Sequence, residues 1–457
     1  MFEQRVYLYI TPFFPSLGNW RGAYCYDFVR TLVRHLELSV GVGSSCAKAP
    51  EDKGWKVVVF KEGDGSDYEL EVEKKNGGGD RKIIVHTFKA RRLPSNIFPN
   101  LFARWNQRSF IRKVKEALTP LFDSSSQLQL LDAVEVCHCN TANYGIYALA
   151  MKKANPRCKT LLHHHDLASF GLNMGVLRHC WIYNMIQFPI LRRMHEKIDC
   201  HVFISEASRR SFLAAPDASW TMYEDYKKQM RGLPYRPARI KGSVILHNGV
   251  DKDVFKVERV GGGGQRTDNS FIIGCVGNFQ ELKGQETLIR AVGLMVGVAR
   301  GGTSSTGSRP RIKLRLVGSG ARLDSCRRLA QELNAEAEFL REVSHEKLAD
   351  FYRGLDLFVL PSWFEGFGCV YTEAHSCGVP FIACEGQGIE DILEVEERSP
   401  WLCRPGDAED LAAKIEKAIN SIAHLHFDTS HSQALQPLNE DQDIDALVGK
   451  FVKEIGL

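Results

Sequence analysis

The chain has 457 residues, which is too long for one ordinary hydrophobic core, so we expect two domains. A hydrophobic fraction of 44% and a charged fraction of 25% are typical of a globular protein in water. The formal net charge of +4 is too small to indicate a nucleic-acid-binding protein.

Short apolar segments alternate with longer segments of helical periodicity from the start of the chain. The first strand is expected at 6–10 and the first helix at 22–36, where every fourth residue from Tyr24 to Leu36 is apolar. Further strands are expected at 38–42, 57–60, 83–85, 134–137, 160–163 and 201–204. This alternation predicts a parallel sheet with helices on both faces.

The alternating pattern restarts after 232–242, a segment rich in proline, glycine and basic residues that has the composition of a linker. A second series of strands is expected at 244–246, 271–276, 313–317, 337–340, 357–360 and 380–383. The sequence therefore predicts an α/β protein with two doubly wound, Rossmann-like domains. The first domain spans 1–235 and is completed by a C-terminal helix within 441–457, and the second spans 241–435.

Several polar or glycine-rich stretches are expected to be loops that carry no catalytic or binding residues. The stretch 63–80 contains NGGGD and is interpreted as a hairpin or a flexible loop, and 260–270 contains GGGGQ. The other stretches of this kind are 301–310 and 426–442.

The thirteen cysteines are dispersed and form no CxxC pair, and the single residue between Cys137 and Cys139 is the wrong spacing for common zinc sites. Dispersed thiols are typical of reduced, cytosolic proteins. The N-terminus has no signal-peptide pattern, and no run of about 18 apolar residues could span a membrane. We therefore expect a cytoplasmic protein.

The segment from Asp356 to Glu394 carries the clearest chemistry. A strand is followed by a glycine-rich loop and then by a helix, and the free N–H groups at such a helix start favour an anion such as a diphosphate. Glu365 lies in the loop and Glu373 in the helix, so one carboxylate can hold sugar hydroxyls and the other ribose hydroxyls. The donor-site candidates in this segment are Glu365, Gly366, Phe367, Gly368 and Glu373.

The stretch EGFGCVYTE, with Glu365 and Glu373 at its ends, resembles the E-x7-E signature of retaining glycosyltransferase family 4. HNGVDKDVF, GNFQELKGQETLIRA, LRLVGSG and FLREVSHEKLADFY are also similar to segments of that family. The resemblance is strong in the second half of the chain and weaker in the first. It implies a GT-B fold, in which the two domains face a central cleft, and transfer with retention of the anomeric configuration. It also implies that Glu365 contacts the donor sugar and Glu373 the ribose.

Three further positions concern the phosphates and the base of the donor. Lys283 follows a strand and can place a positive charge on the departing diphosphate. The family usually has an arginine where this chain has Asn278, which leaves open whether another cation compensates. Arg341 departs from the small residue that is frequent in the family beside the nucleotide base, and Val343 is expected to line that pocket.

The acceptor side is expected in the first domain. The loop TPFFPSLGNWRGAY resembles the family's first glycine-bearing loop, which approaches both the donor phosphates and the acceptor. Gly22 is at the matching glycine and is a further donor-binding candidate, with Arg21 beside it as an added charge. In LLHHHDLASFG, His165 and Asp166 match a His-Asp pair whose histidine lies near the sugar in the family.

The three consecutive histidines of LLHHHDLASFG also allow a metal-site interpretation. On a strand, His163 and His165 share one side and His164 the other. The sequence provides no third ligand at a clear spacing, which disfavours a metal site. In the later segment FISEASRR, Ser205 and Glu206 are expected to cap a helix rather than to bind substrate.

Two stretches, 89–115 and 175–197, combine basic and aromatic residues. They include Arg91, Arg92, Arg104, Trp105, Arg108, Arg112 and Lys113 in the first, and Trp181, Arg192, Arg193 and Lys197 in the second. The simpler interpretation is a set of solvated helix faces. The alternative is contact with a membrane surface or a lipid-linked acceptor at the cytoplasmic face of the membrane.

The sequence thus predicts a retaining glycosyltransferase with Glu365, Lys283 and His165 as its catalytic residues. The donor would be a UDP, GDP or ADP sugar, and the acceptor a glycan or lipid-linked molecule of cell-surface polysaccharide or glycoconjugate synthesis. No aspartate pair of the DxD kind is evident, so no metal or other cofactor is expected. The alternatives are a nucleotide-sugar epimerase, which would not need an acceptor, and an inactive nucleotide-sugar-binding module, for which Asn278 is the argument.

Overall fold

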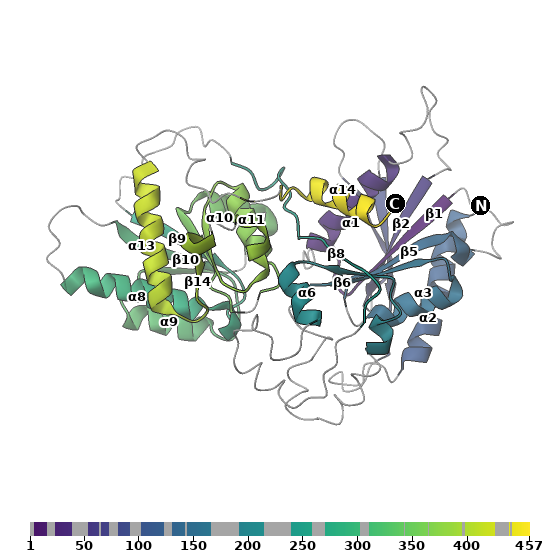
Figure 1. Cartoon of the computed structure of the whole chain (residues 1–457), viewed down its shortest axis with the longest axis horizontal. Coiled ribbons are helices and arrows are strands. Elements are labelled where there is room, and N and C mark those ends of the chain that lie inside the picture. The colour runs from purple at the N-terminus through teal and green to yellow at the C-terminus, as the bar shows by residue number, and fades with distance from the viewer. Residues whose placement is uncertain are drawn as a thin grey trace, which may run out of the picture. The chain divides into compact units, whose positions relative to one another are not determined.

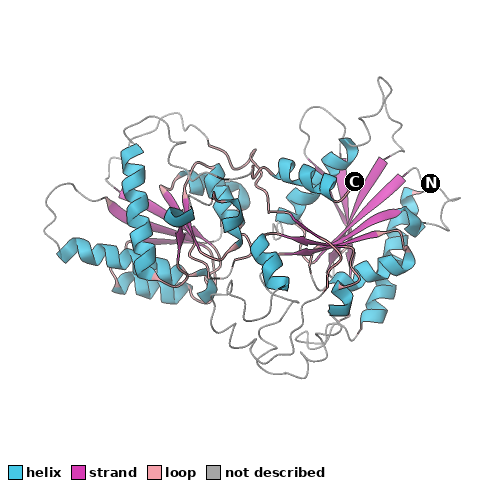
Figure 2. Ribbon diagram, viewed as in Figure 1, coloured by secondary structure: helices cyan, strands magenta, loops and turns pink. Residues whose placement is uncertain are grey.

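The computed structural model describes residues 4–15, 23–38, 54–63, 65–72, 81–91, 102–122, 130–141, 144–165, 192–213, 239–257, 270–301, 310–341, 343–363, 365–394, 398–425, 438 and 441–457. The chain divides into two compact units (Figure 1). One comprises Met1–His247 with Ile444–Leu457, and the other comprises Asn248–Asp443. Each unit is a sheet with helices on both faces, as the sequence predicts (Figure 2).

The sheet of the first unit has eight strands in the order β3-β4-β2-β1-β5-β6-β7-β8. All neighbours are parallel except β3, which pairs antiparallel with β4. The strands are β1 (Gln4–Thr11), β2 (Gly54–Glu62), β3 (Tyr68–Val72), β4 (Arg81–Phe88), β5 (Val134–Cys139), β6 (Lys159–His164), β7 (Cys200–Phe203) and β8 (Ser243–Ile245). The central strands are buried on both faces, which is why their sequences are apolar without alternation.

Two hydrophobic clusters cover the two faces of this sheet. One cluster includes α1 and α14, where the rings of Phe28 and Phe451 lie 5.9 Å apart, and the other includes α2 and α3. The C-terminal helix therefore packs on the first unit beside α1. The helices are α1 (Ala23–Leu38), α2 (Ala103–Leu118), η2 (Thr119–Leu121), α3 (Gly145–Ala154), α6 (Glu206–Leu213) and α14 (Ile444–Glu454).

The sheet of the second unit has six parallel strands in the order β11-β10-β9-β12-β13-β14. They are β9 (Ser270–Val276), β10 (Arg311–Val317), β11 (Ala337–Leu340), β12 (Leu357–Val359), β13 (Phe381–Cys384) and β14 (Leu402–Cys403). The helices are η6 (Glu281–Lys283), α8 (Gln285–Gly301), α9 (Leu323–Glu332), α10 (His345–Arg353), α11 (Cys369–Ser376), η7 (Gly388–Ile392), α12 (Arg398–Trp401) and α13 (Ala408–Leu425). Among the described residues, no helix combines the length and apolar character needed to cross a bilayer.

Two sequence-based expectations need correction, and a third is confirmed in part. The strand expected at 244–246 opens no second series, because β8 pairs with β7 and ends the first sheet. The strand expected at 38–42 begins inside α1, which extends to Leu38, and its remainder lies outside the described residues. The stretch 63–80 contains β3, which forms an antiparallel pair with β4, so the hairpin interpretation holds for its described part.

Candidate functional site

The site predicted for the donor lies where the strand order of the second sheet reverses. From β9 the chain moves outward through β10 and β11, then returns to β12 on the other side of β9 and continues outward to β13 and β14. In open parallel sheets this switch point is where loops separate at the carboxyl edge and ligands bind. The two loops concerned are 277–284 after β9 and 360–368 after β12.

Backbone contacts hold these two loops against each other. The carbonyl oxygen of Leu282 accepts hydrogen bonds from the Trp363 N–H at 2.8 Å and the Ser362 hydroxyl at 3.1 Å. Gly284 has φ 69°, and a Cβ atom at this position would lie 2.0 Å from the carbonyl oxygen of Pro361. A glycine is therefore required for the loops to approach this closely.

Lys283 and Glu365 meet across this loop contact. The Lys283 ammonium donates a hydrogen bond to Glu365 Oε2, and the two side chains are 26% and 17% exposed. Gln387, which is buried, accepts a hydrogen bond from the Glu365 N–H at 2.6 Å and donates one to the Trp363 carbonyl at 3.1 Å. The ion pair is therefore anchored through the backbone of its loop while part of each side chain remains accessible.

Glu373 lies on the first turns of α11, which begins after Gly368. The buried Tyr352 hydroxyl donates a hydrogen bond of 2.8 Å to Glu373 Oε2, which orients the carboxylate. Gly368 has φ 84°, a left-handed conformation that glycine adopts without strain. Burial raises the pKa of the Cys369 thiol to about 12, with further contributions from the charges of Glu373 and Glu365. A Cβ atom at Gly368 would lie 3.2 Å from Glu365 Cγ, and Glu373 is the fifth residue of α11, so both carboxylates lie close to the start of this helix.

The structure places the other predicted donor residues at the same edge of the sheet with different exposure. Asn278 has an exposed side chain on the loop after β9, and its carbonyl accepts a hydrogen bond from Gln285 Nε2 at 3.0 Å. Arg341 is exposed and Val343 half-buried after β11, two strands away from β9. Among the described residues, no hydrogen bond or ion pair joins Arg341 or Val343 to Lys283 or Glu365.

The structure also limits how the loop before α11 can contact a ligand. Gly366 is buried and Phe367 has no exposed surface, so Phe367 packs into the core of the unit. Phe367 therefore presents neither its ring nor its backbone to a ligand, and Gly366 presents little surface. Tyr352 and Gln387 were not expected from the sequence, because each acts on a glutamate more than 20 residues away. The available signal for Gln387 was a polar residue between two glycines just after a strand.

At the carboxyl edge of the first sheet, three neighbouring strands bring a second set of polar residues together. Asn140 follows β5 and donates from Nδ2 to Thr11 Oγ1 at 3.3 Å and to Cys25 Sγ at 3.0 Å. Its Oδ1 therefore faces His165 Nε2, which donates to it at 2.6 Å. This contact fixes the tautomer of His165, whose Nδ1 carries the lone pair.

The predicted alternation of the three histidines is confirmed. The rings of His163 and His165 lie 4.1 Å apart, and His163 also stacks on His138 at 5.4 Å. The His164 ring instead contacts Phe203 and His201 on the neighbouring strand. Burial lowers the pKa of His165 to about 4 and that of His138 to about 3, so both imidazoles are neutral at pH 7.

The remaining predictions concern residues of the first domain. Gly22, Arg21, Asp166 and Trp181 lie outside the described residues. The capping prediction is confirmed for Ser205, whose hydroxyl accepts the Ser208 N–H at 2.9 Å. Glu206 forms an ion pair with Arg209 on the same helix at 2.7 Å.

Comparisons with known proteins found sequence similarity in the second half of the chain. Residues 263–426, which include Lys283, Glu365 and Glu373, match a family described as "Glycosyl transferases group 1". A D-inositol 3-phosphate glycosyltransferase of Mycobacterium tuberculosis is 34% identical over 166 residues. The match covers 34% of this chain and 30% of that protein, so it spans less than a third of the relative's length.

Solved structures match over nearly the whole chain. Anabaena HepE in complex with UDP and glucose has a TM-score of 0.59 at 16% identity, covering 99% of this chain and 100% of that one. Sucrose-phosphate synthase from Thermosynechococcus elongatus has a TM-score of 0.60 at 18% identity, covering 99% of both chains. At these identities the likeness is one of fold. With its two parallel-sheet domains, the protein has the GT-B fold.

The loop contact at Gly284 predicts a large effect of a single methyl group. We expect Gly284→Ala to lower the free energy of unfolding by at least about 2 kcal/mol, because it combines a left-handed backbone with a clash against Pro361. Urea unfolding measures the difference. Gly297→Ala, on an exposed part of α8 with open space around the site, is the control and should be neutral or stabilising by up to about 1 kcal/mol. Equal effects of the two changes would contradict the argument.

The buried histidines predict that acid destabilises the first unit. The pKa of His138 is about 3 in the folded protein and about 6.5 when unfolded, so the unfolded state binds more protons below pH 6.5. Stability from this group is therefore full above pH 6.5 and falls by about 1.4 kcal/mol per pH unit as the pH drops toward 3. Urea unfolding between pH 7.5 and 5 measures the slope. His138→Gln should reduce the slope by up to about 1.4 kcal/mol per pH unit, which corresponds to one proton. An unchanged slope would contradict the low pKa of His138 in the folded protein.

Proposed function

We propose that the protein is a retaining glycosyltransferase that moves a sugar from a nucleoside-diphosphate sugar to a glycan or lipid-linked acceptor. The observation that carries this proposal is the contact of Lys283 with Glu365 at the switch point of the second sheet, with Glu373 on the adjoining helix. The family match at 263–426 covers all three residues. A cation paired with one carboxylate, with a second carboxylate on the adjoining helix, suits a ligand that is a sugar, a diphosphate and a ribose in series.

Lys283 would stabilise the departing diphosphate. An ammonium group has three N–H donors, so Lys283 can keep its hydrogen bond to Glu365 while it donates to a phosphate oxygen. The N-terminus of α11, which begins at Cys369, adds the positive end of a helix dipole close to the same carboxylate. Preorganised positive groups of this kind stabilise charge that develops on a leaving group.

The two glutamates would bind hydroxyl groups on opposite sides of the diphosphate. Glu365, next to Lys283, would contact the sugar, and Glu373 the ribose. A carboxylate can accept several hydrogen bonds, and the Tyr352 hydroxyl takes one position on Glu373 Oε2, so the carboxylate is oriented before the ribose arrives. Tyr352 is thus proposed as a positioning residue for the nucleotide.

His165 would orient the sugar or the acceptor with a neutral imidazole. Its Nε2–H is committed to Asn140, so Nδ1 is the atom that can accept a hydrogen bond from a hydroxyl. We propose that an oxygen of the leaving diphosphate takes the proton of the acceptor hydroxyl. Lys283 and the helix terminus supply the positive charge, so we also propose that transfer requires no metal ion, and that added Mg²⁺ or Mn²⁺ changes the rate less than about twofold.

Nucleotide release from a panel of nucleotide sugars tests the proposal. We expect one donor among UDP, GDP and ADP sugars to release nucleotide only when an acceptor is present. UDP sugars come first because HepE was solved with UDP and with UDP-glucose. Lys283→Ala should lower kcat by about 100-fold or more, since it removes charge stabilisation from the leaving group. Glu373→Ala should weaken nucleotide binding by about tenfold, which a thermal-shift titration measures.

Matched controls separate these effects from general charge changes. Lys347→Ala and Glu409→Ala remove exposed charges of the same kind from α10 and α13 and should leave both readouts unchanged. Conversion of the nucleotide sugar without an acceptor would indicate an epimerase. Tight nucleotide binding with no turnover on any acceptor would indicate an inactive binding module. Wild-type behaviour of both Lys283→Ala and Glu373→Ala would remove the proposed site.

We further propose that α2 contacts an anionic membrane or a lipid-linked acceptor. Its exposed face carries basic residues at every turn, while Phe110 and Val114 on the other face are buried. Trp105 is 40% exposed and lies under the guanidinium of Arg91 at 4.2 Å. The exposed basic residues of this helix are Arg104, Arg108, Arg112 and Lys115. A basic face with an exposed aromatic ring is typical of helices that bind at a membrane surface.

Flotation with anionic vesicles tests the membrane contact. Each basic residue near an anionic surface contributes about 1 kcal/mol, so Arg108→Gln with Arg112→Gln should weaken vesicle binding by about 30-fold. The control is Arg290→Gln with Arg328→Gln, which removes two exposed arginines from the other unit. A wild-type protein that stays wholly unbound at low salt would refute the contact.

A further inference from the structure

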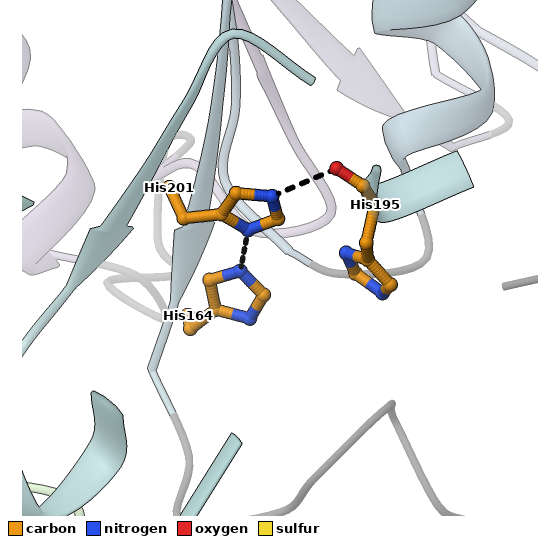
Figure 3. A group of neighbouring side chains, drawn as sticks. All are labelled: His164, His195 and His201. Carbon is orange, nitrogen blue, oxygen red and sulfur yellow. Dashed lines mark hydrogen bonds between the residues drawn. The ribbon is translucent and has the colours of Figure 1, made fainter. Parts of the chain in front are cut away.

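A group of three buried histidines lies on the opposite face of β6 from His165. His164 ends β6, His201 lies on the neighbouring strand β7, and His195 precedes that strand. Their exposed fractions are 6%, 0% and 0%. One ring nitrogen from each of the three lies within 4.8 Å of the other two. Figure 3 shows the three rings gathered around a common point.

The hydrogen bonds of His201 define which of its nitrogens is available. His201 Nε2 donates to the carbonyl oxygen of His195 at 3.1 Å, so its Nδ1 carries the lone pair. That lone pair faces His164 Nε2 at 2.9 Å (Figure 3). Metal-bound histidines typically donate a hydrogen bond from one ring nitrogen to a backbone carbonyl and bind the metal through the other nitrogen. His201 makes the first of these contacts through Nε2.

We propose that His164, His195 and His201 form a structural site for a transition-metal ion of the Zn²⁺ class. Three neutral imidazoles suit Zn²⁺, Co²⁺, Ni²⁺ or Cu²⁺, and they do not suit Mg²⁺ or Ca²⁺, which prefer oxygen ligands. Three protein ligands leave one position of a tetrahedral ion for a further group.

The geometry needs only small side-chain adjustments to accept such an ion. Zinc–nitrogen bonds of about 2.0–2.1 Å in a tetrahedron place ligand nitrogens about 3.4 Å apart. The His164–His201 pair at 2.9 Å must open by roughly 0.5 Å, and the widest separations, which are at most 4.8 Å, must close by up to about 1.4 Å. Rotation of the rings about their side-chain torsions supplies movements of this size.

Aromatic rings surround this group of histidines. The rings of Phe203 and Phe212 lie 4.6 Å and 4.7 Å from the His164 ring, and Phe212 lies 4.9 Å from the His195 ring. Burial lowers the pKa of all three histidines, which keeps them in the neutral form that ligates metals.

A metal ion bound by these histidines would connect the end of β6 to β7 and to the segment that contains His195. The next residue after His164 is His165, so the site would position the imidazole that the proposed transferase uses. This inference adds a structural ion in the first unit and leaves the donor residues, which belong to the second unit, without a metal. It therefore does not depend on the transfer chemistry.

Cobalt binding to the chelator-treated full chain tests the site. We expect one Co²⁺ per chain with the visible absorption bands of a tetrahedral ion, and displacement of Co²⁺ by one Zn²⁺. His195→Gln and His201→Gln should each weaken Co²⁺ binding by at least about 100-fold, since even outer-shell changes cost 10–100-fold. His163→Gln, on the opposite face of the same strand, is the matched control and should bind as the wild type does.

A second measurement avoids variants that fail to fold. X-ray absorption of the zinc-loaded wild-type chain should show imidazole nitrogens at about 2.0 Å, with the multiple scattering of histidine rings. A shell of sulfur ligands would overturn the proposal, as would the absence of stoichiometric Co²⁺ and Zn²⁺ binding. Equal loss of binding in His163→Gln and His195→Gln would overturn it as well.

Discussion

The close approach of two backbone segments, Gly284 on Pro361 and Trp363 on Leu282, is the constraint on which the candidate donor site depends. It brings together Lys283 and Glu365, which are 82 residues apart in the chain. The strand order makes this possible, because β9 and β12 are neighbours although two strands lie between them in sequence. The site is therefore a consequence of sheet topology first and of side-chain chemistry second.

How much of this could be predicted from the sequence depended on the range of the interaction. Glu365, Glu373 and Lys283 were identified because glycines and strand ends mark their loops locally. Tyr352 and Gln387 were missed, because their role is to hold a glutamate in another element. The strand at 243–245 was recognised but assigned to the wrong series, since an apolar tripeptide contains no information about which sheet it joins.

The three consecutive histidines at 163–165 show the same limit at closer range. The period of two along a strand correctly separated His164 from His163 and His165. The same reasoning disfavoured a metal site, because no further ligand followed at a clear spacing. His201 lies 37 residues from His164 and reaches it only because β6 and β7 pair in register. Parallel pairing across a long connection thus assembles a ligand group that no local motif marks.

The ionisable groups of the two candidate sites lie in opposite environments. In the second unit, a lysine and two carboxylates lie at a partly exposed edge, where a compact ammonium with rotatable donors can serve both a carboxylate and a phosphate. Asn278 contributes no charge there, so the proposed stabilisation of the leaving group rests on Lys283 and the start of α11. In the first unit, imidazoles are buried among aromatic rings and stay neutral at pH 7. Salt should therefore act mainly on donor binding and acid mainly on the fold of the first unit, because screening affects exposed charges and protonation affects buried neutral bases.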